Sequence, residues 1–125
     1  MANKPIPKKT LVLGASENPQ RYSYLAVQKL LNNQHPVVAV GKKAGMVKGV
    51  QISTGKEHFS EIDTITLYLN PANQKQYYDY ILSLNPKRII FNPGTENPEL
   101  ATLAKNNSID TLQACTLVML STGQY

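Results

Sequence analysis

The sequence predicts an α/β protein with a Rossmann-like three-layer fold, built on a mostly parallel sheet of five to six strands. Short apolar runs alternate along the 125-residue chain with stretches of helical spacing. Several of these runs are apolar at every position, which is typical of strands buried on both faces of a parallel sheet. Alternation of this kind places helices on both sides of the sheet.

The first half of the chain carries the glycine-bearing loop on which the functional prediction rests. Its predicted elements are a strand over 9–14, a helix over 21–33, a strand over 36–40 and a short strand over 50–53. Residues 11–13 are uniformly apolar, as in a buried strand. Tyr24 and Val27 share one helical face, and Pro36 follows the end of that helix. The lysine- and glycine-rich stretch 41–49 is predicted to be a loop.

The second half repeats the alternation. Its predicted elements are a strand over 62–69, a helix over 71–84, a strand over 87–91, a helix over 98–106, a strand over 108–113 and a short helix over 115–120. Asn70 is a favourable N-cap, and Pro71 suits the first helical position. The connector 55–61 has room for one helical turn.

Length and charge indicate one domain over residues 9–125, preceded by a basic N-terminal arm over residues 1–8. The net charge of +5 is uneven, because residues 1–50 hold eight lysines and arginines against one acidic residue, Glu17. No apolar run approaches the ~20 residues that a membrane span needs. A single cysteine fits a reducing compartment. We therefore expect a cytoplasmic protein, with no membrane segment and no metal site.

Polar turns follow the predicted strands and are expected to meet at one edge of the sheet. Ligands of open α/β sheets bind beyond the carboxyl ends of the strands, where the strand order reverses. The turns expected there are Gly14-Ala15-Ser16, Gly41-Lys42-Lys43, Asn70-Pro71 and Asn92-Pro93-Gly94. The first of them leads into a helix, so its glycine and the helix N-terminus suit a phosphate.

The residues around these turns disfavour NAD. Gly14 is followed by Ala15 and Ser16 instead of the further glycines of a dinucleotide motif. Lys42 and Lys43 stand where an acidic residue would hold the ribose of NAD. Lysines at this point would attract a phosphate on the adenosine ribose, which NADP and coenzyme A (CoA) both carry. The residues alone leave CoA, NADP and a fold without ligand open, and they show no nucleic-acid-binding signature.

The loop 14–23 and the order of the later motifs resemble the small, single-domain bacterial CoA-binding proteins. The first motif of that family is a strand, then G-x-S, a short acidic or Asn link, and Pro, Arg and Ser before a helix. Gly14, Ser16, Arg21 and Ser23 match it. The resemblance covers nearly the whole chain, and the domain is similar to the CoA-binding domain of the succinyl-CoA synthetase α subunit. In that relative, the loops after the first two strands hold the CoA nucleotide.

The resemblance implies CoA as the ligand and assigns its contacts by position. The implied contacts are Gly14, Ala15 and Ser16 at the phosphates, Arg21 and Ser23 at the helix start, Gly41, Lys42 and Lys43 near the adenosine, Leu69, Asn70 and Pro71 under the adenine or the pantetheine, Asn92, Pro93 and Gly94 in the next turn, and the terminal Cys115. Gly41 replaces the usual Asn-Pro of the family, and the turn 91–95 replaces its Trp/Leu-Gln-x-Gly. Contacts at these two turns are therefore expected to differ from those of the family.

No set of residues for catalysis converges on the predicted turns. His35 and His58 are expected to be surface residues with structural roles. Cys115 is either a small buried side chain or a thiol at a helix start that forms a mixed disulfide with CoA. We expect a non-catalytic protein that binds CoA or an acyl-CoA. The alternative is an NADP-binding protein, or an accessory subunit whose catalytic residues lie on a partner chain, and a protein partner or homo-oligomer stays open.

Overall fold

A computed structural model describes residues 6–125 and contains one seven-stranded sheet in the order β3-β4-β2-β1-β5-β6-β7. The strands are β1 (Thr10–Leu13), β2 (Val37–Val40), β3 (Gly45–Val47), β4 (Val50–Ser53), β5 (Thr64–Leu67), β6 (Arg88–Phe91) and β7 (Asp110–Gln113). All pairings are parallel except that of β3 with β4. The predicted α/β class and mostly parallel sheet are confirmed, but the predicted count of five to six strands is wrong.

The additional strand is β3, which lies inside the stretch predicted to be a loop. It runs antiparallel to β4 with Val47 opposite Val50, so Lys48 and Gly49 alone form the turn. Both turn residues have positive φ, 50° for Lys48 and 85° for Gly49, as a two-residue type I′ hairpin turn requires. Lysine rarely adopts this conformation, and its presence hides the hairpin signal in the sequence.

Within residues 6–125, five α-helices connect and flank the strands. They are α1 (Tyr22–Asn32), α2 (Pro71–Gln74), α3 (Tyr78–Leu84), α4 (Pro98–Asn106) and α5 (Thr116–Ser121), and a 3₁₀ turn over Lys75–Tyr77 joins α2 to α3. The helix predicted over 71–84 is thus interrupted, and the connector 55–61 holds no helical turn. Asn70 caps α2 as predicted, because its side chain accepts a hydrogen bond from the Asn73 amide at 2.9 Å.

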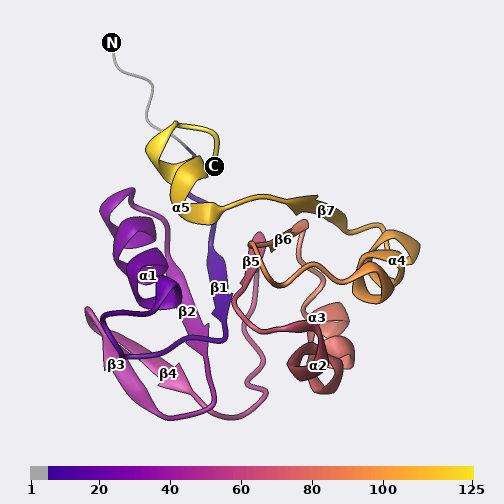
Figure 1. The fold of residues 1–125 in the computed structure, drawn as a ribbon, viewed down its shortest axis with the longest axis horizontal. Helices are drawn as coiled ribbons and strands as arrows, with labels where there is room; N and C mark the ends of the chain where they lie inside the picture. Colours follow the sequence, from indigo (N-terminus) through magenta and orange to yellow (C-terminus); the bar gives the residue numbers. More distant parts are fainter. Residues whose placement is uncertain (1–5) are drawn as a thin grey trace.

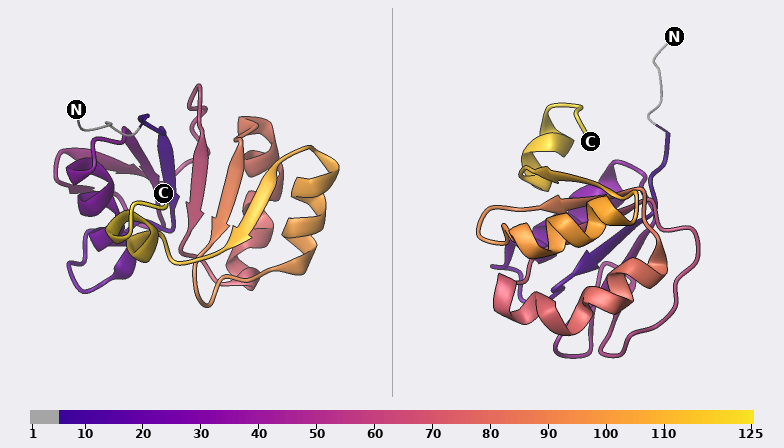
Figure 2. Two further views of the ribbon diagram at one scale, coloured as in Figure 1. Left: turned by 90° about the horizontal axis from the view of Figure 1, so that it is seen from above. Right: turned by 90° about the vertical axis from the view of Figure 1, so that its right-hand side faces the viewer.

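The helices form a layer on each face of the sheet (Figure 1), and Figure 2 shows α1 and α5 on the side opposite α2 and α3. Side chains alternate along each strand. Leu11 and Leu13 of β1 therefore pack toward α3 and α4, whereas Val12 packs toward α1 and α5. The strand order reverses between β1 and β5, since β2 and β4 lie on one side of β1 and the later strands on the other. This reversal is where a ligand site is expected.

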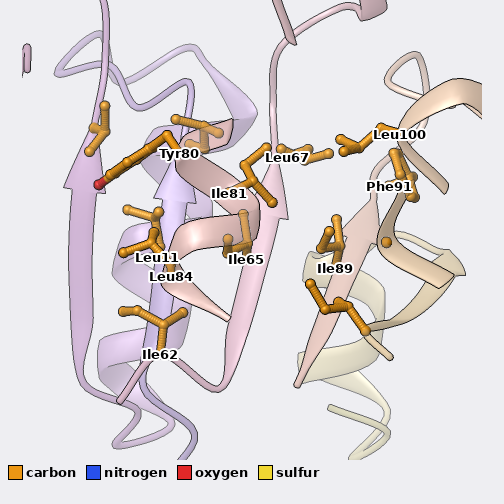
Figure 3. Packing of buried hydrophobic residues seen from close by; sticks show 14 residues of the cluster. Leu11, Ile62, Ile65, Leu67, Tyr80, Ile81, Leu84, Ile89, Phe91 and Leu100 are labelled. Atoms are coloured by element: carbon orange, nitrogen blue, oxygen red, sulfur yellow. The ribbon is translucent and has the colours of Figure 1, made fainter. Parts of the chain in front are cut away.

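The larger core cluster lies between the sheet and the two helices α3 and α4 (Figure 3). Ile65 and Ile89 of the strands meet Ile81 of α3 and Leu100 of α4, and all four side chains are fully buried. Tyr80 is buried in the same cluster, and its two neighbouring tyrosines, 77 and 78, pack partly against it. The chain's own core thus accounts for these tyrosines.

Tyr80 is expected to ionise only at strongly alkaline pH. Its hydroxyl donates a hydrogen bond to the Glu57 carbonyl. Burial, followed by the charge of Glu57 and by Tyr77, raises the pKa of Tyr80 to about 12 from its ordinary value of 10. The folded state therefore holds this proton more tightly than the unfolded chain, and stability falls as the pH rises from about 10 to about 12. Tyrosinate absorbance during an alkaline titration measures the ionisation. Tyr80→Phe should remove one tyrosinate step at about pH 12 and leave the steps of the other tyrosines in place, and an unchanged titration would contradict the assignment.

The basic arm predicted over 1–8 falls partly on residues 1–5, which lie outside the described residues. Lys8 is held in place: its amide donates to Nδ1 of His35 at 3.0 Å, and its Nζ donates to the carbonyl of Tyr125. His35 is buried and not on the surface as predicted, whereas His58 is exposed as predicted. Burial, then the charges of Lys8 and Arg88, lowers the pKa of His35. His35 precedes β2, at the amino end of the sheet.

Candidate functional site

A cleft of about 840 Å³ opens at the carboxyl ends of β2, β1, β5 and β6. Its walls come from the loops after these four strands and from the start of α1. The cleft therefore lies over the point between β1 and β5 where the strand order reverses. This is the edge of the sheet at which the sequence predicts a ligand.

The loop after β1 forms the centre of the cleft and is held tightly to its neighbours. The amides of Gly14 and Ala15 both donate to the carbonyl of Val40, at 2.9 and 3.0 Å. Gly14 has a φ of 98°, and a Cβ there would lie 2.9 Å from the carbonyl carbon and oxygen of Tyr68. Only glycine suits this position, because it tolerates positive φ and leaves room for the Tyr68 backbone just after β5.

The N-terminus of α1 faces the cleft without a capping side chain. Arg21 is the N-cap residue and makes no side-chain capping hydrogen bond, and the first turn holds no acidic residue. Within residues 6–125, the amides of Tyr22 and Ser23 have no hydrogen-bond acceptor. Free amides and the positive end of the helix dipole together favour an anion.

Three basic side chains add to this positive end. Arg21, Lys42 and Lys43 line the cleft and are exposed. Glu17 is the one acidic residue among the described lining residues, and its Oε2 accepts a hydrogen bond from the Met46 amide at 3.3 Å. With three basic side chains against one acidic one, the balance of charge in the cleft favours an anionic ligand.

Most of the predicted site residues come together in this cleft. Those that line it are Gly14, Ala15, Ser16, Arg21, Ser23, Lys42, Lys43, Leu69, Asn70, Pro93 and Gly94. Residues from four separate loops thus share one cavity, as parallel strand ends require.

Four predicted residues do not line the cleft. Gly41 is buried beneath it, where a Cβ would lie 2.3 Å from the carbonyl oxygen of Ala15. Pro71 is the first residue of α2. Cys115 is the half-buried N-cap residue of α5 and makes no side-chain capping bond. The turn prediction does not distinguish residues that face a cavity from residues that hold its walls.

Asn92 is the fourth, and it is almost fully buried at 2% exposure. Its Nδ2 donates to Thr66 Oγ1 at 2.7 Å and to the Leu67 carbonyl at 2.8 Å. Its Oδ1 accepts from the Thr116 amide at 2.8 Å. The Asn92 side chain therefore joins β5, β6 and α5, and all its partners are within the protein.

The sequence prediction missed several lining residues. These are Glu17, Asn18, Gln20, Tyr22, Ala44, Tyr68 and Thr95. Tyr68 was assigned to a strand over 62–69, but β5 ends at Leu67 and Tyr68 turns into the cleft wall. Burial raises the pKa of Tyr68, and its buried hydroxyl has no hydrogen-bond partner within residues 6–125. The signal available in the sequence was Asn70, because a helix N-cap at this position leaves room for a turn before it and so favours a strand that ends before residue 69.

The sequence profile of the CoA binding domain family matches residues 8–121. The chain belongs to this family. A crystal structure of an uncharacterized protein has 49% sequence identity and a TM-score of 0.95, and the match covers 97% of this chain and 100% of that one. No curated protein matches the sequence.

Solved structures with lower sequence identity share the fold of this CoA binding domain. A Thermus thermophilus protein is 18% identical with a TM-score of 0.84, over 95% of this chain and 91% of its own. The dinucleotide-forming acetyl-coenzyme A synthetase 1 of Ca. Korarchaeum cryptofilum, solved with phosphate and ADP, is 16% identical with a TM-score of 0.69. That match covers 88% of this chain and 26% of the synthetase.

Two further findings concern the same domain. None of the helices over residues 6–125 has the length and apolarity needed to cross a membrane. Within the same range, no three His, Cys, Asp or Glu side chains gather as a metal site would require.

Proposed function

We propose that this CoA binding domain protein binds CoA or an acyl-CoA and does not itself catalyse a reaction. The observation that carries the proposal is the cleft at the strand reversal, where Arg21, Lys42 and Lys43 join the uncapped start of α1. A CoA molecule carries a diphosphate and a phosphorylated ribose, which are the groups that this arrangement suits.

The proposal divides the cleft between the parts of the ligand. The loop of Gly14, Ala15 and Ser16, together with the start of α1, would hold the diphosphate. Lys42 and Lys43, on the opposite side of this loop from β5, would hold the phosphate on the ribose. The wall formed by the loops after β5 and β6 is then left for the pantetheine arm.

The non-catalytic part of the proposal rests on the side chains that line the cleft. The described lining residues include no histidine and no cysteine, and Glu17 is hydrogen-bonded to β3. The hydroxyls of Ser16, Ser23 and Thr95 in the lining therefore have no imidazole among these residues to activate them as nucleophiles. Cys115 lies outside the lining, so we assign it no contact with the ligand.

The double variant Lys42→Ala/Lys43→Ala is expected to weaken CoA binding by at least about tenfold, because each lysine offers a charge-assisted contact to phosphate. Isothermal titration with CoA, acetyl-CoA, NADP and NAD measures the affinities. Dephospho-CoA, which lacks the ribose phosphate, should bind the variant and the wild type with nearly equal affinity.

The matched control is Lys75→Ala/Lys105→Ala, which removes the same charge from exposed positions outside the cleft. Equal weakening by both pairs would contradict a specific role of Lys42 and Lys43. Tighter binding of NADP than of CoA would select the NADP alternative, and binding of NAD without CoA would end the proposal.

A further inference from the structure

Gln74, the last residue of α2, is a fully buried polar side chain directly behind the cleft. Its Nε2 donates to the carbonyl of Leu69 and to the carbonyl of Thr95, both at 2.8 Å. Leu69 and Thr95 line the cleft, and they belong to different loops, which follow β5 and β6. One side chain thus connects two segments of the cleft wall without facing the cleft itself.

The neighbouring Asn97 determines which way the Gln74 amide is turned. Asn97 caps α4, and its Oδ1 accepts from the amides of Glu99 and Leu100 at 3.1 and 3.2 Å. Its Nδ2 must therefore donate, and it does so to Gln74 Oε1 at 2.9 Å. With its oxygen committed in this way, Gln74 directs both N–H donors at the two loop carbonyls, which can only accept.

The network continues from Asn97 to the surface. The second Nδ2 donor of Asn97 reaches the Tyr78 hydroxyl at 2.8 Å, and that hydroxyl donates to the Glu99 carboxylate at 2.9 Å. Every donor in the chain from Glu99 to Gln74 has an acceptor. A buried network that is satisfied in this way fixes one arrangement of the segments it joins.

Thr95 is itself tied to the turn that follows β6. Its amide and its hydroxyl both donate to the Asn92 carbonyl, at 2.9 and 2.8 Å. Holding the Thr95 carbonyl therefore holds the whole turn, including Pro93 and Gly94 of the cleft lining. The hydrogen bond from Gln74 Nε2 to the Leu69 carbonyl then sets the separation between this turn and the loop after β5.

We infer that Gln74 is a positioning residue for ligand binding, which sets the shape of the cleft wall farthest from Lys42 and Lys43. It touches no ligand, since its side chain has no exposed surface. The inference rests on the proposed function, because it takes CoA or an acyl-CoA as the ligand. Gln74 should then govern binding of the part of CoA beyond the phosphorylated adenosine.

The test is Gln74→Glu, which keeps the shape of the side chain but replaces Nε2 and its two N–H donors with a carboxylate oxygen. An ionised carboxylate would face the carbonyls of Leu69 and Thr95, so we expect CoA affinity at about pH 8 to fall about tenfold. Affinity for adenosine 3′,5′-bisphosphate, which lacks the pantetheine arm, should stay within about twofold of the wild type. At acid pH the buried carboxyl becomes neutral and regains a donor, so the ratio of variant to wild-type affinity should recover.

Gln76→Glu is the control, because it adds the same charge at an exposed position one half-turn away. It should leave both affinities unchanged. Unaltered CoA affinity in Gln74→Glu, or equal losses for CoA and the bisphosphate, would overturn the positioning role.

Amide hydrogen exchange separates this inference from the proposed function. Gln74→Glu should speed exchange in the loops after β5 and β6 while exchange in β1 stays slow, whether or not CoA is present. If the wild type binds no CoA, the proposed function fails, and unchanged exchange in these two loops would then also overturn the role of Gln74.

Discussion

Replacing Gly41 with alanine is expected to lower the free energy of unfolding by about 3 kcal/mol and to abolish measurable binding in the cleft. A Cβ at this position would lie 2.3 Å from the carbonyl oxygen of Ala15 and 2.9 Å from Cγ2 of Ile52. Neither neighbour can retreat easily. The Ala15 amide is hydrogen-bonded to Val40 at 3.0 Å, and Ile52 is buried in β4.

The effect on binding follows from what the added methyl group displaces. The Ala15 carbonyl belongs to the loop proposed to hold the diphosphate, and any shift that relieves the contact moves that loop. Denaturant unfolding measures the stability, and titration with CoA measures the binding. Gly41 thus shapes the site by close backbone approach and contributes no contact of its own.

The matched control is Gly55→Ala, because a Cβ at Gly55 would have no atom within 4 Å. Its stability should stay within about 0.5 kcal/mol of the wild type, as for most surface substitutions. If Gly41→Ala were as stable as this control, the loops after β1 and β2 would be free to separate, and the packing argument would be wrong.

Local signals were sufficient to predict the sheet class and the edge that carries the cleft. Apolar runs marked the parallel strands, and the Asn97-Pro98 pair marked the start of α4 at its observed position. Because parallel strands end at a common edge, the turns at Gly14 and Asn70 were expected to be neighbours, and both line the cleft.

Contacts between distant residues could not be predicted in the same way. Nothing around Gln74 in the sequence indicates that its amide reaches Thr95, 21 residues away. Asn92 was placed among the ligand contacts because it begins a polar turn, yet its partners are Thr66 and Thr116. A turn residue's direction depends on tertiary packing, which a local pattern does not contain.

Asn92→Ala is expected to cost about 3 kcal/mol of folding stability, an effect as large as that of Gly41→Ala. The substitution removes three buried hydrogen bonds, two that the Asn92 side chain donates and one that it accepts. The Thr116 amide and the Leu67 carbonyl are then left without these partners. Asn106→Ala, at an exposed position in α4, is the control and should change stability by about 0.5 kcal/mol or less.

Asn92→Asp distinguishes a structural role from a ligand contact. The aspartate keeps the shape and still accepts from the Thr116 amide, but an ionised Oδ would face the Leu67 carbonyl where Nδ2 now donates at 2.8 Å. Burial would raise the pKa of this new carboxyl above its unfolded value, so the stability of the variant should fall as the pH rises from about 4 to about 8. The wild type, with a neutral amide, should lack this slope, which unfolding at several pH values would measure.

If Asn92 instead bound the ligand directly, both substitutions would weaken CoA binding with little loss of stability. A large loss of stability without CoA present is therefore the result that assigns Asn92 to the scaffold of the cleft.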